Sequence, residues 1–383
     1  MKKQEKEQKK IIRTFAAASF LNDLGSDIIY PIWPLFVTMI LKANMAALGF
    51  LDGIGEALVS LSQAASGYLS DRIKKRKIFI WTGYLLGALS RLGYAVSSVW
   101  PHLIPFRALD RAGKIRSAPR DAFVADVSTE ENRGRNFGLL RAMDHLGAVF
   151  GILICIAFFS LLGYRILFAL AAIPSVISVF LIFSLIKERK SDEIKIYKGI
   201  SLKDLDKNFR LFLVLSSVYA LGAFSYSFLL IYAKRFGFKV TFVPVLYLIF
   251  TASASLFSYP FGKLSDKIGR KSVLMLSFLF WAAVCLSLIL SRSEKMVIFS
   301  FILYGAHKGA LEPVQKTFVS ELAPKEFRAS VLGGYQMVIG LCALPASFIA
   351  GVLWEGFGMS APFYFSLILT IISGFMLVFV KKR

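Results

Sequence analysis

Long apolar segments separated by short charged clusters run along the whole chain. Each segment is long enough to cross about 30 Å of hydrocarbon as a helix that rises about 1.5 Å per residue. No ten-residue alternating pattern of the kind that a membrane β-barrel needs is visible. The pattern therefore predicts an all-α polytopic membrane protein with about 12 transmembrane helices. The segments cover residues 14–41, 46–69, 78–98, 102–125, 137–160, 164–186, 209–233, 240–262, 272–291, 296–319, 330–354 and 361–380.

The composition supports this class. Of the 383 residues, 56% are hydrophobic, 14% are aromatic and only 18% are charged, which is typical of a protein in a bilayer. The first apolar segment is too long for a cleavable signal peptide and carries Asn22, Asp23 and Asp27, so it is expected to be a transmembrane helix. The three cysteines form no C-x-x-C pattern, and no two histidines have metal-ligand spacing. We expect no metal and no cofactor.

The placement of the basic residues predicts the topology. A formal net charge of +22 is compatible with nucleic-acid binding, but the lysines and arginines gather in alternate loops. By the positive-inside rule this pattern places both termini and the central loop in the cytoplasm, with the chain in the plasma (inner) membrane. The basic rims are expected to contact anionic lipid headgroups rather than nucleic acid. The clusters lie at 2–13, 72–77, 187–210, 263–271 and 381–383.

A duplicated sequence divides the chain. The segment 67–77 recurs as 262–271, and Asp71 and Asp266 lie 195 positions apart. The same offset relates Asp126 to Glu321, so the repeat covers most of each half. Duplicated helical bundles in membranes usually give alternating access to a site at their shared midplane. We therefore expect two six-helix bundles joined by a loop, with boundaries at 1–186, 187–208 and 209–383.

The repeated loop also resembles a known signature. Its pattern, Gly-x-x-x-Asp-Arg-x-x-x-Arg-Lys between the second and third spans, is similar to that of the major facilitator superfamily, and the resemblance covers nearly the whole chain. The resemblance implies a fold of two six-helix bundles and secondary transport. It also implies that the loop residues control gating rather than bind substrate. These residues are Gly67, Asp71, Arg72, Gly262, Asp266 and Arg270, and the glycines are expected to allow close helix approach.

Two further motifs resemble those of branches within the family. Residues 107–113 are similar to the fourth-helix motif of proton-coupled members, although Asp110 and Arg111 replace the usual Gln and Gly. Gly147 and Gly151 in the fifth span are similar to the Gly-rich motif of the antiporter branch. The proline of that motif is absent, which argues against drug export. The resemblance therefore implies a proton-coupled, antiporter-like transporter.

The predicted spans of the first half contain an unusual number of charges. Seven acids accompany seven bases. An unpaired charge at the bilayer centre costs about 2.5–3.5 kcal/mol on insertion scales, so these groups must pair with one another or line a wet cavity. The acids are Asp23, Asp27, Asp52, Glu56, Asp110, Asp121 and Asp144, and the bases are Arg91, Arg107, Arg111, Lys114, Arg116, Arg120 and Arg141.

Helical spacing selects a candidate site in the first and fourth spans. Asp23 and Asp27 fall on one stripe of a helix, and they are candidates for proton coupling. The alternative is a fixed ion pair with a nearby arginine. In the fourth span four polar residues share a face that is expected to line the central cavity. Arg116 and Arg120 are expected to point to the opposite side of this helix and to lie nearer its cytoplasmic end. The four are Arg107, Asp110, Arg111 and Lys114.

Other spans contribute further candidates. In the fifth span Arg141, Asp144 and His145 lie together, and His145 is either a proton relay or a packing residue. Asp52 and Glu56 are expected to pair with a base such as Arg91 or to serve a gate.

The tenth span carries a candidate site in the second half. Lys308, Glu312 and Lys316 follow at steps of four, which predicts an ion ladder on a helix that is broken near Pro313.

These features predict a secondary transporter that moves a small charged organic solute by alternating access, coupled to protons, and that acts as a monomer. The arginines and lysines suit an anion or a zwitterion, whereas free aspartates would suit a cation or a metal complex. The alternatives are an exporter of drugs or siderophore complexes, or a receptor or scaffold on the same fold. No H-E-x-x-H, G-x-S-x-G or Walker-type sequence is present, so an enzyme is not expected.

Overall fold

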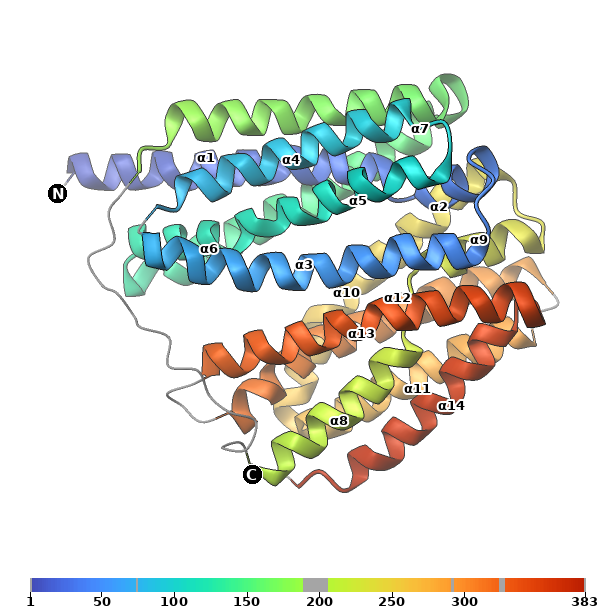
Figure 1. Ribbon diagram of the computed structural model, residues 1–383. Coiled ribbons are helices and arrows are strands. Elements are labelled where there is room, and N and C mark those ends of the chain that lie inside the picture. Colours follow the sequence, from blue (N-terminus) through green and yellow to red (C-terminus); the bar gives the residue numbers. More distant parts are fainter. Residues whose placement is uncertain (1, 74, 189–205, 291–292, 324–327, 382–383) are drawn as a thin grey trace. The chain divides into compact units, whose positions relative to one another are not determined.

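The structure is a computed structural model that describes residues 2–73, 75–188, 206–290, 293–323 and 328–381 (Figure 1). These residues form helices and no strand, so the predicted all-α class is confirmed. Most of the central loop predicted at 187–208 lies outside the described residues. The first half contains α1 (Lys2–Ile29), α2 (Trp33–Leu35), the π-helix η1 (Phe36–Ile40), α3 (Met45–Ile73), α4 (Lys77–Val96), η2 (Trp100–His102), α5 (Leu103–Ala112), η3 (Gly113–Arg116), α6 (Ser117–Val127) and α7 (Glu130–Leu185). The second half contains α8 (Lys207–Gly222), α9 (Ser227–Phe236), η5 (Val240–Phe242), α10 (Val243–Ile268), α11 (Arg270–Ile289), α12 (Glu294–Leu322), α13 (Arg328–Phe357) and α14 (Ala361–Val378).

These helices account for the predicted membrane spans. Among the described residues, seven helical segments are long and apolar enough to cross a membrane. One of them, 135–185, contains two predicted spans, because Gly163 interrupts it with a φ of 69° that side chains rarely adopt. The remaining predicted spans are α1, α4, α5 with α6, and α12, which are helical but less apolar. Large apolar side chains such as Leu161 and Tyr259 are 77% exposed, as lipid-facing residues are.

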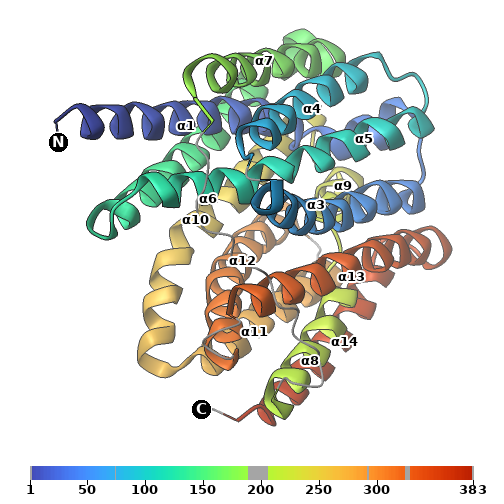
Figure 2. The ribbon, with the colours of Figure 1, turned by 60° about the vertical axis from the view of Figure 1, so that its left-hand side comes forward.

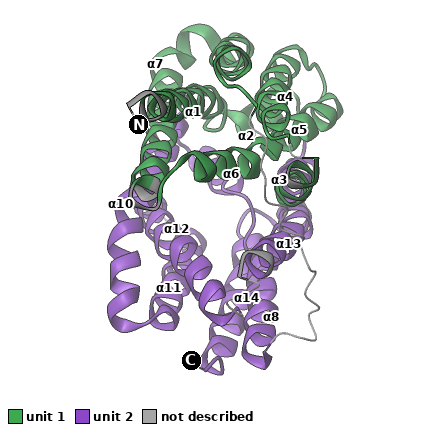
Figure 3. Ribbon diagram, turned by 90° about the vertical axis from the view of Figure 1, so that its left-hand side faces the viewer, with its two compact units in different colours: residues 1–42, 58–196 green, residues 43–57, 197–383 purple. Residues whose placement is uncertain are grey.

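Contacts group the chain into two compact units, which Figure 3 colours separately. The first contains residues 1–42 and 58–196, and the second contains residues 43–57 and 197–383. Helix α3 is therefore divided, and its first part groups with the second half of the chain. The bundle boundaries at 186 and 209 stay a prediction from the sequence repeat.

In the first unit, α1 packs along α7, and α4 packs on both α5 and α7. Gly147 and Gly151 of α7 allow this approach, because a Cβ atom at either position would collide with a backbone carbonyl of α1, at Phe20 or at Leu24. The apolar core where α1, α4, α6 and α7 meet contains Ile11, Phe15, Ile80, Tyr84, Phe123, Val124, Leu140 and Ile182. This close packing fixes the polar face of α1 against α4 and α7.

In the second unit, α10, α11 and α12 lie together, and α8 packs against α13 and α14 (Figure 2). The first part of α3 packs on α13, since Gly49 and Gly53 face the backbone at Ser347 and Leu344. The backbone N–H of Met45, at the start of α3, donates to the Glu355 carboxylate at 2.7 Å.

Three helices differ from their predicted form. The first span is broken, because α1 ends at Ile29 and Pro31 and Pro34 each lack the N–H that would continue the helix. The fourth span tightens to a 3₁₀ turn at 113–116, which changes the direction of every later side chain. The break expected near Pro313 is wrong, since α12 runs without interruption through it.

Candidate functional site

A carboxylate lies beside two guanidinium groups on the buried side of α5. Asp110 Oδ2 is 3.5 Å from Arg111 Nε and 3.9 Å from Arg107 Nη1. Its other oxygen is 3.5 Å from the Ser90 hydroxyl of α4. Arg107 is 2% exposed and Arg111 is 7% exposed, so both charges lie inside the first unit. We call Arg107, Asp110 and Arg111 the Arg107 cluster.

Aromatic residues at the break after α1 hold both arginines. The Arg107 guanidinium carbon lies 4.6 Å from the centre of the Trp33 ring, and that of Arg111 lies 5.3 Å from the centre of the Tyr30 ring. Such cation–π contacts strengthen when the groups are removed from water. Each guanidinium therefore contacts both an aromatic ring and the Asp110 carboxylate.

The two aspartates of α1 lie beside this cluster. Asp27 is 8% exposed and lies one turn before Tyr30, which is within electrostatic reach of Asp27 and of all three members of the Arg107 cluster. Asp23 accepts a hydrogen bond from the Asn22 amide at 2.9 Å and acts electrostatically on Lys114. The structure thus brings the candidate residues of the first and fourth spans together.

A second charged group joins α6 to α1 and α7, and we call its members Arg120, Asp121 and Asp144 the Arg120 cluster; of these, Arg120 is buried. Arg120 Nη1 is 2.6 Å from the Ser19 hydroxyl and 3.8 Å from Asp144, and its Nη2 is 3.0 Å from Asp121. The expectation that Arg120 points to the opposite side of the fourth span from Arg107 is wrong, because after the 3₁₀ turn Arg120 meets the first span at Ser19, as Arg107 does at Trp33.

The other candidates of the fifth span flank this cluster. Arg141 completes it at 3.4 Å from Asp144. His145 is exposed, and within the described part of the chain no hydrogen bond or ion pair links it to either cluster.

Arg91 is a buried residue at the contact of α4 with α1 and α7. It is 1% exposed and donates to the Asn22 carbonyl at 3.0 Å, to the Ser26 hydroxyl at 2.7 Å, to the Ala171 carbonyl at 2.9 Å and also to Ser175. Asp52 and Glu56 belong to the other unit, so their expected pairing with Arg91 stays a prediction. Arg91 ties α4 to α1 and α7 through neutral oxygens.

Asp52 belongs to the part of α3 that groups with the second unit. There it accepts a hydrogen bond from Ser225 at 2.7 Å.

In the second unit the candidate residues lie on α12. The Lys308 ammonium is 5.9 Å from the centre of the Tyr304 ring, and Glu56 and Glu312 act on it electrostatically. Among the described residues Lys308, Glu312 and Lys316 form no ion pair with one another, so the predicted ladder is wrong.

His307, next to Lys308, is buried between two other helices. Its Nδ1 lies 2.8 Å from the Ser277 carbonyl, and its Nε2 lies 2.9 Å from the Tyr219 hydroxyl. Since a carbonyl only accepts, Nδ1 carries the proton and Nε2 accepts from Tyr219. The described residues contain no group of ligands suited to a metal.

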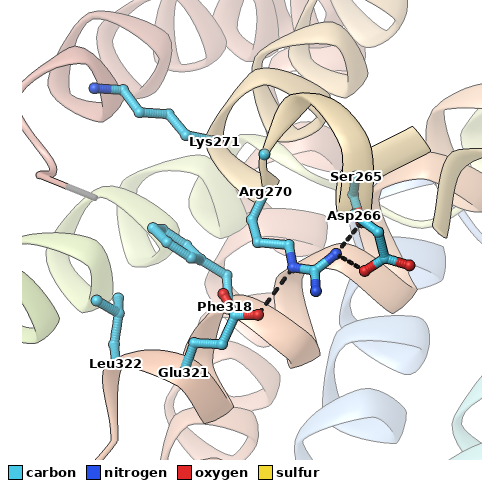
Figure 4. Close-up of a pocket in the computed structure, with 8 residues that line it drawn as sticks. Ser265, Asp266, Arg270, Lys271, Phe318, Glu321 and Leu322 are labelled. Carbon is cyan, nitrogen blue, oxygen red and sulfur yellow. Dashed lines mark hydrogen bonds and ion pairs between the residues drawn. The ribbon is translucent and has the colours of Figure 1, made fainter. Parts of the chain in front are cut away.

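The repeated loop forms an ion network at the end of α10. Arg270 Nε donates to Glu321 of α12 at 3.0 Å, and its Nη1 donates to the Ser265 hydroxyl at 2.7 Å and pairs with Asp266 (Figure 4). Lys271 points away from Arg270 and Glu321, and it donates to backbone carbonyls at the end of α14. A cavity of about 320 Å³ lies beside these side chains. We call Asp266, Arg270 and Glu321 the Arg270 network.

The first unit repeats this arrangement. Arg76 pairs with Asp126, which the sequence repeat relates to Glu321. Arg72 is exposed, and the side chain of Asp71 lies outside the described residues. The close helix approach expected at the glycines of the repeated loop is not found among the described residues of each unit, because none lies within 4 Å of a Cβ atom built at Gly262, and a Cβ atom at Gly67 meets only Ala118 at 3.5 Å.

Sequence reasoning missed Trp33 and Ser90, which contact the Arg107 cluster. Pro31 and Pro34 on either side of Trp33 were the available signal, because two prolines three residues apart predict a break at that point. Ser90 had no signal, since a serine in an apolar span is ordinarily satisfied by a carbonyl of its own helix.

Several known proteins are similar to this chain in sequence. The sequence matches the profile of the Major Facilitator Superfamily over residues 15–248 and 210–383. An uncharacterised MFS-type transporter of Methanocaldococcus jannaschii is 34% identical over 385 residues, which cover 98% of this chain and 96% of the relative. The quinolone resistance protein NorA of Staphylococcus aureus is 22% identical over 381 residues, which cover 95% of this chain and 94% of NorA.

Solved structures share the fold. A mutant of the nucleoside transporter NupG superposes with a TM-score of 0.84 at 14% identity, covering 97% of this chain and 100% of NupG. A POT family transporter in complex with 5-aminolevulinic acid superposes with a TM-score of 0.77 at 13% identity, covering 96% of this chain and 95% of that transporter.

Proposed function

The chain belongs to the Major Facilitator Superfamily, and on that premise we propose that it moves a small charged organic solute by alternating access, coupled to protons. It is a multi-pass membrane transporter and not an enzyme. The charge of the solute and the coupling ion are the finer parts of the proposal, and both rest on residues of the first unit.

The observation that carries the proposal is the Arg107 cluster at the break after α1. Ionisable residues inside a membrane ordinarily mark a path for substrate or ions, because burying them is costly. Discontinuous helices are likewise typical of transporter binding sites, since their free backbone ends and side chains can face a ligand. Here both features coincide, with Tyr30 and Trp33 of the break contacting Arg111 and Arg107.

Proton coupling is supported by the acids next to this cluster. Asp27 is buried near Tyr30, and Asp23 lies one turn earlier on the same stripe of α1. A buried carboxyl gains or loses its proton readily when a neighbouring cation moves. We therefore assign Asp23 and Asp27 to proton transfer, with Arg107, Arg111 and Lys114 on the solute side.

The remaining sites take supporting roles in this proposal. The Arg270 network and its counterpart Arg76–Asp126 act on the conformational change. Lys308 and Glu312 contribute to the lining of the solute cavity in the second unit. The transporter acts as a monomer in the plasma membrane, with both termini cytoplasmic and with anionic lipid headgroups against its basic rims.

The test is solute uptake by purified protein in liposomes. A thermal-shift screen first identifies a solute, because a ligand of the folded state raises the apparent stability. An imposed pH gradient should then drive accumulation of that solute. Asp27→Asn should uncouple uptake from the gradient, and Arg107→Ala should abolish it.

Arg235→Ala and Glu294→Gln serve as controls, because both side chains are exposed and lie outside the clusters. Uptake that is insensitive to the gradient in the unaltered protein would contradict proton coupling. Full activity of Arg107→Ala would remove the proposed site.

Export of drugs is a second candidate function. It is favoured by the similarity to the quinolone resistance protein NorA over nearly the whole chain and by the tight packing at Gly147 and Gly151. Cells that produce the protein would then extrude ethidium and tolerate more quinolone than cells that produce the Arg107→Ala variant. Equal tolerance in both would reject this candidate.

A further inference from the structure

We propose that Asp110 is an internal counter-ion that occupies an anion site between Arg107 and Arg111, and that a carboxylate of the solute replaces its charge when Asp110 is protonated. This inference rests on the proposed function and adds two things to it. It names the solute class, an organic carboxylate, and it names the residue through which proton binding and solute binding are linked.

The ion pairs of Asp110 are loose. Its distances of 3.5 Å to Arg111 and 3.9 Å to Arg107 exceed the ~2.7–2.9 Å of a charge-assisted hydrogen bond. Its contact with the Ser90 hydroxyl is also long, at 3.5 Å. Asp110 therefore neutralises the arginines without the close contact that Arg270 makes with Glu321 at 3.0 Å.

The arginines keep their places without Asp110. Arg107 lies against the Trp33 ring and Arg111 against the Tyr30 ring, and these contacts need no carboxylate. Tight packing of α1 on α7 at Gly151 fixes the helix that leads to both rings. When the charge of Asp110 is lost, two preorganised guanidinium groups remain, and a guanidinium binds a planar carboxylate in a bidentate manner.

The charge around Asp110 favours an anion. Four cations act on it electrostatically, namely Arg91, Arg107, Arg111 and Lys114. Protonating Asp110 therefore raises the net charge of the cluster by one. Binding of one solute carboxylate returns the net charge to its former value. The facing groups are Arg107, Arg111 and Lys114 on its own span, Ser90, Arg91 and Tyr94 on α4, and Asp27, Tyr30 and Trp33 on the first span.

This exchange balances in charge and protons. One proton from solution binds the Asp110 carboxylate, and one solute carboxylate takes over its two arginine contacts. Release reverses both events. The cluster thus carries one proton with each carboxylate.

The test measures binding of defined probes to the purified full-length protein. Thermal stabilisation by sodium acetate, benzoate and glutarate is compared with that by benzamide and inorganic phosphate, at pH 5.5, 6.5 and 7.5. For one linked proton the apparent affinity for the best carboxylate should fall about tenfold per pH unit at the upper end. Benzamide should not bind.

Asp110→Asn should bind the same carboxylate with an affinity that does not change with pH and that is at least as high as that of the unaltered protein at pH 5.5. Asp110→Glu, which keeps a carboxyl group, should keep the pH dependence of carboxylate binding. Arg111→Gln should weaken binding at least tenfold at all three pH values. Should Asp110→Asn fail to fold, the charge-balanced variant Asp110→Asn with Lys114→Met carries the same expectation of pH-independent binding.

Several results would overturn the inference. If carboxylate binding by Asp110→Asn depends on pH as strongly as before, the linked proton binds at another residue. If that variant loses carboxylate binding, Asp110 contacts the solute directly. Stabilisation by phosphate alone, or by no carboxylate at pH 5.5, would remove the proposed solute class. Gradient-driven uptake together with pH dependence in Asp110→Asn would leave the proposed function standing and reject only this inference.

Discussion

Replacing Glu321 by glutamine tests the Arg270 network without a change of size. The Glu321 side chain is 47% exposed and that of Arg270 is 19% exposed, so water screens their 3.0 Å contact. Ion pairs of this kind contribute about 0.2–1 kcal/mol to stability. We expect the free energy of unfolding to fall by at most about 1 kcal/mol, and the melting temperature to fall by about 2 °C or less.

The effect on transport should be larger than the effect on folding. If the network distinguishes two conformations of the transporter, losing 1 kcal/mol changes their ratio by about fivefold. The rate of solute exchange in liposomes should therefore change by about two- to fivefold, and the affinity for solute should stay the same. Asp126→Asn, in the matching position of the first unit, should have an effect of the same size, because Arg76 makes the corresponding contact.

The control lies on the same helix. Glu294→Gln removes a carboxyl from the first turn of α12, where it stabilises the helix dipole by about 0.3–1 kcal/mol. It should cost similar stability and leave the exchange rate unaltered. A melting temperature lowered by 10 °C in Glu321→Gln would show that the network is architectural, and an unchanged exchange rate would refute its role in gating.

Three further predictions concern the packing around the sites. Gly151→Val should destabilise the protein by about 1–3 kcal/mol or more, measured by thermal unfolding in detergent, because its Cβ would collide with the Leu24 carbonyl; a wild-type melting curve would contradict the tight α1–α7 contact. Arg91→Leu should cost at least about 2 kcal/mol in the same assay, since it strands buried oxygens such as Ser26 Oγ, and Arg91→Lys should recover part of the loss. Lys271→Met should leave melting nearly unchanged and speed amide exchange at the end of α14 about fivefold, because Lys271 holds two carbonyls there; unchanged exchange would reject this anchoring.

The membrane spans and the repeat could be predicted from the sequence because both depend only on the order of residues along the chain. Apolar length decides whether a helix can cross a bilayer, and backbone groups in lipid must be satisfied within the segment. The same reasoning grouped Arg107, Asp110 and Arg111, since these residues lie on one α-helix whose spacing is regular.

The errors arose where the helical phase changed or a partner came from a distant element. The 3₁₀ turn after α5 redirected Arg120 toward Ser19 and Asp144. The oxygen partners of Arg91 within its own unit, carbonyls and hydroxyls of α1 and α7, were likewise not foreseen. Neither outcome is visible in residue spacing, because both depend on how helices pack in three dimensions.

The two halves of the chain share one set of contacts and differ in another. Arg76 with Asp126 recurs as Arg270 with Glu321, and Lys77, which donates to the Phe183 carbonyl at 2.7 Å, recurs as Lys271 at the end of α14. The Arg107 cluster has no such counterpart in the described part of the second half. We propose that contacts present in both halves serve a movement that both must make, and that a cluster present in one half serves the solute. Substitutions in the repeated contacts should therefore alter the transport rate for every solute, and substitutions in the Arg107 cluster should alter which solute is bound.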